Sequence, residues 1–106
     1  MKNENAYWLE LIPSGWTGLA YKMIEECEAI DPTFEVIGYD NNSNDLWLVG
    51  DSAEEYHEQI VATIRKYAEK SKHICCQCGA PAKRKNYFMP FCEKCHHQTF
   101  DFFQNL

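Results

Sequence analysis

Two pairs of cysteines lie near the C-terminal end of the chain. Cys75 and Cys78 form one C-x-x-C pair, Cys92 and Cys95 form another, and thirteen residues separate the pairs. A C-x-x-C pair places two thiolates on one tight turn, and structural zinc binds four such soft ligands in a tetrahedron. The spacing therefore predicts a Zn²⁺ site of the zinc-ribbon or treble-clef type, with these four cysteines as its ligands.

The first pair contains an ambiguity. Cys76 is adjacent to Cys75 and can replace it as a ligand, although the common spacing favours Cys75. Gly79 directly follows Cys78 and agrees with such a turn, because the chain there often needs a positive φ. We expect Cys76 to be a partly covered thiol. We expect three nearby histidines to remain outside the tetrahedron: His73, His96 and His97.

Four sulfur ligands argue against catalysis at this metal. They close the coordination shell, whereas catalytic zinc keeps one position open for water. The His-x-Glu motif of zinc deaminases is absent ahead of the second pair. Elsewhere, Cys27 lies on an apolar helix face and is better interpreted as a buried thiol than as a nucleophile. His57 lies among glutamates and is better interpreted as a solvated histidine than as a general base. We therefore expect no catalytic residues and no enzyme.

The length of the apolar runs in the sequence bears on the cellular location of the protein. The first residues lack the continuous apolar region of a signal peptide, and the longest apolar runs span only a few residues. A membrane-spanning helix needs about 20. We therefore expect a cytoplasmic protein without a membrane partner. Thiols stay reduced in that compartment, so paired cysteines there bind metal more often than they form disulfides.

Charge is distributed unevenly. Residues 1–71 carry a balance of −9, and residues 72–106 carry +3. The acidic part should repel nucleic acid. Between the cysteine pairs, however, a basic triplet precedes an aromatic residue, a combination that can contact phosphates and stack on bases. This gives four candidate nucleic-acid contacts: Lys83, Arg84, Lys85 and Tyr87.

The elements before the cysteines read as a small α+β body. Apolar residues recur at helical spacing from Trp16 to Ile30, and Pro32 ends that helix. Residues 34–39 and 46–49 are rich in β-branched and aromatic types and flank the sequence NNSN, which predicts a hairpin.

A second helix follows the hairpin. Ser52 and Glu55 have capping-box spacing at its start. The segment AYWLELI, residues 6–12, predicts either a strand or a short helix. The fold class is therefore α+β: a small antiparallel hairpin sheet with two helices in residues 1–71, followed in residues 72–106 by a zinc-ribbon-like pair of cysteine turns with a short hairpin between them and an aromatic tail.

The chain resembles a group of small, mostly uncharacterised bacterial and prophage proteins. They share a GW that opens a helix, an IDP-like break, a hairpin, and a helix that runs into C-x-x-C-G-x-P…C-x-x-C. Here these motifs are Gly15-Trp16, Ile30-Asp31-Pro32, the hairpin of residues 34–49, and CCQCGAPAK…FCEKC. The resemblance implies a phage or bacterial origin. The phrase C-x-x-C-G…P-F-C-x-x-C is also similar to DksA/TraR zinc fingers, which bind RNA polymerase, although the gap between the pairs is shorter here.

Together these features predict a non-enzymatic, zinc-stabilised module that binds another protein. An acidic body with many aromatic residues suits an inhibitor or adaptor, encoded by a phage or mobile element, that meets a host protein. The alternative is a regulator associated with nucleic acid or RNA polymerase through its zinc ribbon.

Overall fold

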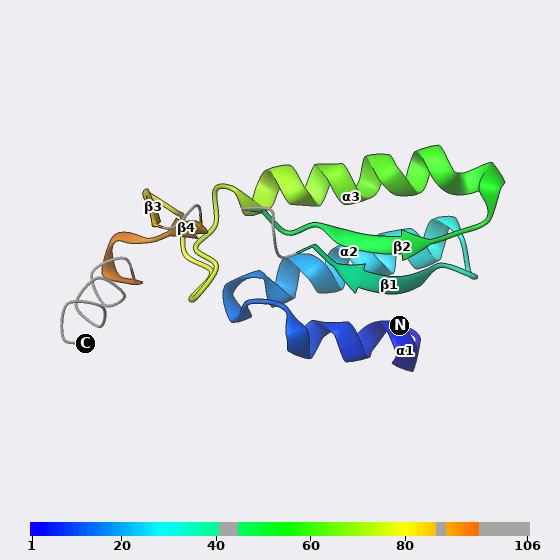
Figure 1. The fold of residues 1–106 in the computed structure, drawn as a ribbon, viewed down its shortest axis with the longest axis horizontal. Coiled ribbons are helices and arrows are strands. Elements are labelled where there is room, and N and C mark those ends of the chain that lie inside the picture. Colours follow the sequence, from blue (N-terminus) through cyan, green and yellow to red (C-terminus); the bar gives the residue numbers. More distant parts are fainter. Residues whose placement is uncertain (41–44, 87–88, 96–106) are drawn as a thin grey trace.

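The computed structural model describes residues 1–40, 45–86 and 89–95, and of residues 84–86 it describes the backbone alone. The candidate contact Tyr87, the loop NNSN and the tail from His96 to Leu106 lie outside the described residues. In chain order the elements are α1 (Asn3–Ala6), η1 (Tyr7–Leu11), η2 (Ser14–Trp16), α2 (Thr17–Ile30), β1 (Glu35–Tyr39), β2 (Leu48–Asp51), η3 (Glu54–Tyr56), α3 (His57–Ser71), β3 (Arg84–Asn86) and β4 (Met89–Phe91), where η marks a 3₁₀ helix (Figure 1).

The two long helices and the first hairpin form the body. α2 and α3 pack against each other, and the antiparallel β1–β2 hairpin lies along them (Figure 1). One side of each element is apolar and buried, so the elements share one core. Its members include Met23 and Ile24 from α2, Val36 and Leu48 from the hairpin, and Ile64 from α3.

The structure confirms the predicted α+β class, the first long helix and both hairpins. α2 ends where Asp31 precedes Pro32, because the residue before proline is excluded from the helical region. β1 pairs with β2, with Tyr39 opposite Leu48, but the second strand spans Leu48–Asp51 and so lies two residues later than the predicted 46–49. The hairpin predicted between the cysteine pairs forms from β3 and β4, with Arg84 opposite Phe91.

Two local predictions have different outcomes. Of the two forms predicted for residues 6–12, the helical one is confirmed: residues 6–11 form the end of α1 and all of η1, and Ile12 follows in extended backbone. The predicted capping box of Ser52 and Glu55 is wrong: α3 begins at His57, after η3, and neither helix start has a side-chain cap. The N–H of Ala53 instead donates to Asp31 Oδ2 at 2.8 Å. A carboxylate at the end of α2 therefore accepts a hydrogen bond from the residue that precedes η3.

Candidate metal centre

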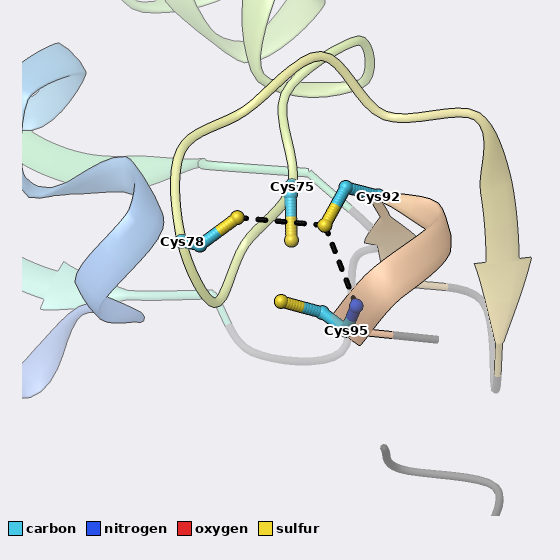
Figure 2. Close-up of side chains that lie close together, drawn as sticks. All are labelled: Cys75, Cys78, Cys92 and Cys95. Carbon is cyan, nitrogen blue, oxygen red and sulfur yellow. Dashed lines mark hydrogen bonds between the residues drawn. The ribbon is translucent and has the colours of Figure 1, made fainter. Parts of the chain in front are cut away.

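The four predicted cysteines come together at one point. The Sγ atoms of Cys75, Cys78, Cys92 and Cys95 all lie within 4.8 Å of one another. Figure 2 shows the four side chains pointing toward a common centre. The Cys78 and Cys92 sulfurs are 3.5 Å apart, far beyond the roughly 2.05 Å of a disulfide bond. No disulfide joins any cysteine of the described chain.

The first pair is held by a tight turn. The Gly79 N–H donates to the Cys75 carbonyl at 2.9 Å, and the Cys75 N–H donates to the Ala80 carbonyl at 2.7 Å. Gly79 has φ +84°, which confirms the predicted positive φ and explains why glycine suits the position. The turn therefore closes on its own backbone and brings both thiols of the pair to the same side.

The second pair follows β4. Cys92 comes directly after the strand, and residues 93–95 form a helical turn. The Cys95 N–H donates to the Cys92 sulfur at 3.4 Å. The two turns are also joined to each other, because the Cys76 N–H donates to the Pro90 carbonyl at 3.0 Å. Backbone hydrogen bonds thus set the distance between the two halves of the quartet.

Hydrogen bonds also favour a thiolate in the quartet. Burial raises the pKa of the Cys75 thiol, but hydrogen bonds to its sulfur outweigh burial and lower that pKa to about 6. The donors are the backbone N–H groups of Cys92, Cys78 and Gln77 and the side chain of Cys78. Burial raises the pKa of Cys95. A positive ion would favour the charged form of all four thiols, since metal ligation requires the thiolate.

The donor set fits a tetrahedral metal. Four sulfurs at about 2.3 Å from a zinc ion lie about 3.8 Å apart, close to the 3.5 Å found between Cys78 and Cys92. Three of the four cysteines are buried, and Cys78 is exposed. Within the described residues, no other histidine, cysteine, aspartate or glutamate belongs to this group. The quartet can therefore hold a metal ion with sulfur ligands alone.

The neighbouring cysteine and histidine lie outside this quartet. Cys76 is buried, and burial raises the pKa of its thiol to about 11. The structure thus places Cys75, and not Cys76, among the four close sulfurs. His73 is exposed and does not belong to the quartet. His96 and His97 lie outside the described residues.

The remaining candidate residues do not converge on a second centre in the described chain. Cys27 is fully buried in α2, and burial raises its thiol pKa to about 12. His57 lies with three glutamates and Gln59 along a hollow of about 360 Å³ at the start of α3. All five side chains lining it are exposed, and they do not form a close ligand group. The absence of enzymatic activity stays a prediction.

The basic segment between the pairs is only partly described. Lys83 is exposed, and its N–H donates to the Phe91 carbonyl at 2.9 Å. Arg84 and Lys85 belong to β3, where the backbone alone is described, and Tyr87 lies outside the described residues. A nucleic-acid contact through these four residues therefore stays a prediction.

Residues far from the cysteines in sequence also take part in the site. The short helix η2 (Ser14–Trp16) donates hydrogen bonds to the backbone of the first cysteine turn, Cys75–Gly79, and of Ile74 just before it. The motif GW is the one signal in the sequence that marks this segment, and it does not say what the segment contacts.

Comparisons with known proteins add no family. No protein-family model matches the chain, and searches of curated proteins and of solved structures find no significant match. The resemblance to bacterial and prophage proteins and to DksA/TraR fingers therefore stays a prediction. None of the helices in the described residues is both long and apolar enough to cross a bilayer.

Proposed function

We propose that the protein is a non-enzymatic, zinc-stabilised module that binds another protein, encoded by a phage or mobile element as an inhibitor or adaptor of a host protein. The observation that carries this proposal is the sulfur quartet, which no histidine or carboxylate of the described chain joins. Four thiolates would complete the shell of zinc and leave no position for a reacting water. Zinc would then supply folding free energy to the C-terminal segment.

The exposed side of the β1–β2 hairpin supports a protein partner. Ile37 and Val49 are 57% and 41% exposed, so two β-branched side chains face solvent. Glu35 lies opposite Asp51 in the strand register, and both are exposed. Like charges opposite each other destabilise an antiparallel pair, and a cationic partner would relieve that repulsion.

The charge of the body indicates the same kind of partner. Residues 1–71 carry a balance of −9. Such a field attracts a basic protein from a distance and speeds its association more than it strengthens the complex. The favoured partner is therefore a protein with a basic and partly apolar surface.

The metal is tested by native mass spectrometry of the protein expressed in medium that contains zinc. We expect one Zn²⁺ per chain. A chelator should remove the ion and lower the melting temperature, because binding free energy contributes to folding. A protein that carries no metal and melts unchanged in EDTA would contradict the zinc centre.

The protein partner is tested with matched variants. Zinc-loaded wild type captures proteins from a bacterial lysate, and the captured protein is purified and titrated directly. We expect the double variant Ile37→Ser/Val49→Ser to weaken that binding about fivefold or more. Tyr21→Ser, which alters an exposed aromatic residue on α2, is the control and should bind as wild type. Equal binding by wild type and the double variant would exclude this surface.

A titration with single-stranded and duplex DNA at two salt concentrations tests the alternative. Phosphate contacts weaken steeply with salt, because they release counterions. Tight, salt-sensitive binding that the triple variant Lys83→Ala/Arg84→Ala/Lys85→Ala abolishes would favour a nucleic-acid-associated regulator over the protein-binding module.

A further inference from the structure

η2 (Ser14–Trp16) contacts the backbone of the first cysteine turn, Cys75–Gly79, at several points. Three donors of η2 reach three carbonyl oxygens in or next to this turn. The contacts are Ser14 Oγ to Gln77 O at 2.7 Å, Gly15 N to Cys76 O at 2.8 Å, and Trp16 Nε1 to Ile74 O at 2.9 Å. Because each bond ends on the backbone, together they restrain the conformation of the turn and not merely its side chains.

Gly15 lies so close to this turn that a Cβ atom would not fit between them. A Cβ atom on Gly15 would lie 2.1 Å from the Cys75 carbonyl oxygen and 2.7 Å from the Gly79 nitrogen. These two atoms are the ends of the hydrogen bond that closes the turn. Any larger side chain at position 15 must therefore move the backbone that carries the Cys75 ligand.

Trp16 connects the same contact to the core of the body. Its side chain is fully buried and belongs to one apolar cluster with Met23 of α2 and with three of the quartet cysteines, Cys75, Cys92 and Cys95. Its indole N–H is satisfied by the Ile74 carbonyl, just before the first cysteine turn. A shift of the turn would thus break a partly buried hydrogen bond of a core residue, which is costly.

We propose that Gly15 and Trp16 are positioning residues of the metal centre: η2 holds the first cysteine turn in the conformation that binds the ion and links occupancy of the centre to the packing of the core. This inference rests on the metal centre proposed above. Neither residue belongs to the sulfur quartet; both act through the Cys75–Gly79 turn. Since coupling between two processes is reciprocal, metal binding stabilises the core and a distorted η2 weakens metal binding.

The test compares Gly15→Ala with Gly18→Ala, which makes the same change one helical turn away. A Cβ at Gly18 meets nothing within 4 Å. Affinity for Co²⁺ and Zn²⁺ is measured by chelator competition, with the thiolate-to-cobalt absorption band as the readout of four-sulfur ligation. We expect Gly15→Ala to weaken metal binding about 10- to 100-fold, as loss of a supporting contact to a ligand does, and Gly18→Ala to bind as wild type.

Trp16→Phe is a milder variant that keeps a smaller aromatic ring in the core and removes the N–H donor. We expect it to weaken metal binding about two- to tenfold. For each variant the melting temperature is measured with and without metal. A residue that only stabilises the fold lowers both values equally, whereas a positioning residue reduces the increase that metal produces. The inference would be overturned if both variants bound metal with wild-type affinity and metal raised their melting temperatures as much as it raises that of wild type.

The result also separates this inference from the proposal beneath it. If wild type binds no Co²⁺ or Zn²⁺, the metal centre itself is wrong, and the inference fails with it. If wild type binds one ion with a four-thiolate spectrum and Gly15→Ala binds it equally well, the metal centre stands and the role of η2 is overturned.

Discussion

At the scale of single residues, one peptide unit separates two thiols with different surroundings. Cys75 contributes its sulfur to the quartet, and backbone N–H groups favour its thiolate. Cys76 is buried outside the quartet, where burial favours the neutral thiol. Its backbone nevertheless matters, because the Cys76 carbonyl accepts the Gly15 N–H and its own N–H donates to Pro90.

Substitution of the two adjacent cysteines by alanine should therefore have unequal effects. Loss of one of four thiolates removes roughly a quarter of the binding free energy of structural zinc, about 3 kcal/mol, which is about a 100-fold loss of affinity. We expect this for Cys75→Ala. Cys76→Ala should keep one zinc per chain at nearly wild-type affinity. Chelator competition measures both, and loss of metal from Cys76→Ala alone would reverse the assignment.

At the scale of elements, two buried polar side chains join segments that are distant in the sequence. Asn5 of α1 is fully buried; its Oδ1 accepts the Val36 N–H at 2.8 Å, and its Nδ2 donates to the Phe34 carbonyl at 3.0 Å. Asn5 thus occupies part of the edge of β1 that a third strand would otherwise use. Asp31, at the end of α2, holds the turn before α3 through Ala53.

Asn5→Ala should destabilise the protein. It would leave the buried N–H of Val36 without its partner and the carbonyl of Phe34 with only the longer bond from Lys2 Nζ at 3.4 Å, at a cost of about 1–3 kcal/mol in the free energy of unfolding. Asn3→Ala changes an exposed residue of the same helix and should stay within about 0.5 kcal/mol of wild type. Urea unfolding followed by circular dichroism measures both. Equal stability of the two variants would show that the Asn5 contacts contribute little.

Asp31 should make stability depend on pH in the acid range. The Ala53 N–H, followed by the hydroxyl and N–H of Thr33, lowers the pKa of the Asp31 carboxyl below its ordinary 3.8. A lowered pKa in the folded state means that the stabilisation is complete above pH 3.8 and is lost as the pH falls through the lower folded value.

Thermal melts of wild type and Asp31→Asn at several pH values measure this dependence. We expect the variant to melt several degrees lower at pH 7 and the difference to shrink as the pH falls below 3.8. Glu10→Gln alters an exposed carboxyl of η1 and serves as the control, which should change the melting temperature little. A difference for Asp31→Asn that stays constant with pH would argue against the ionised carboxylate as the stabilising form.

At the scale of the whole molecule, the cysteine segment and the body share contacts. β3 and β4 lie at one end of the molecule, and the turn between β2 and α3 lies at the other (Figure 1). Between them runs one apolar cluster that contains residues of α2 and α3 as well as quartet cysteines. The division into residues 1–71 and 72–106 stays a prediction, but hydrogen bonds from η2 join the two parts directly.

Alkylation of Cys27 should report global unfolding of the metal-bound protein. Its side chain is fully buried in α2, and burial raises its thiol pKa to about 12. If global unfolding costs about 5 kcal/mol, Cys27 should react at least about 1,000-fold more slowly than in the unfolded chain. Iodoacetamide labelling with mass spectrometry measures the rates, and Cys27→Ala identifies the labelled site. Labelling in native buffer at the unfolded rate would contradict the burial of this residue.

The sequence by itself determined the features that depend on short, regular spacing. Two C-x-x-C pairs and a following glycine predict the quartet and the positive φ of Gly79, because a tight turn fixes the separation of its own thiols. Helical periodicity and Pro32 predict α2, and β-rich segments predict the first hairpin. In each case the physical cause acts within a few residues.

Only the tertiary structure decided which distant groups pair in hydrogen bonds with the backbone N–H and carbonyl groups. Asp31 replaces the expected capping box across 22 residues, and Ser14 reaches Gln77 across 63. The helical form of residues 6–11 belongs to the same class. No local pattern encodes these outcomes, since a buried donor or acceptor accepts any partner that the packing of the whole chain brings within hydrogen-bonding distance.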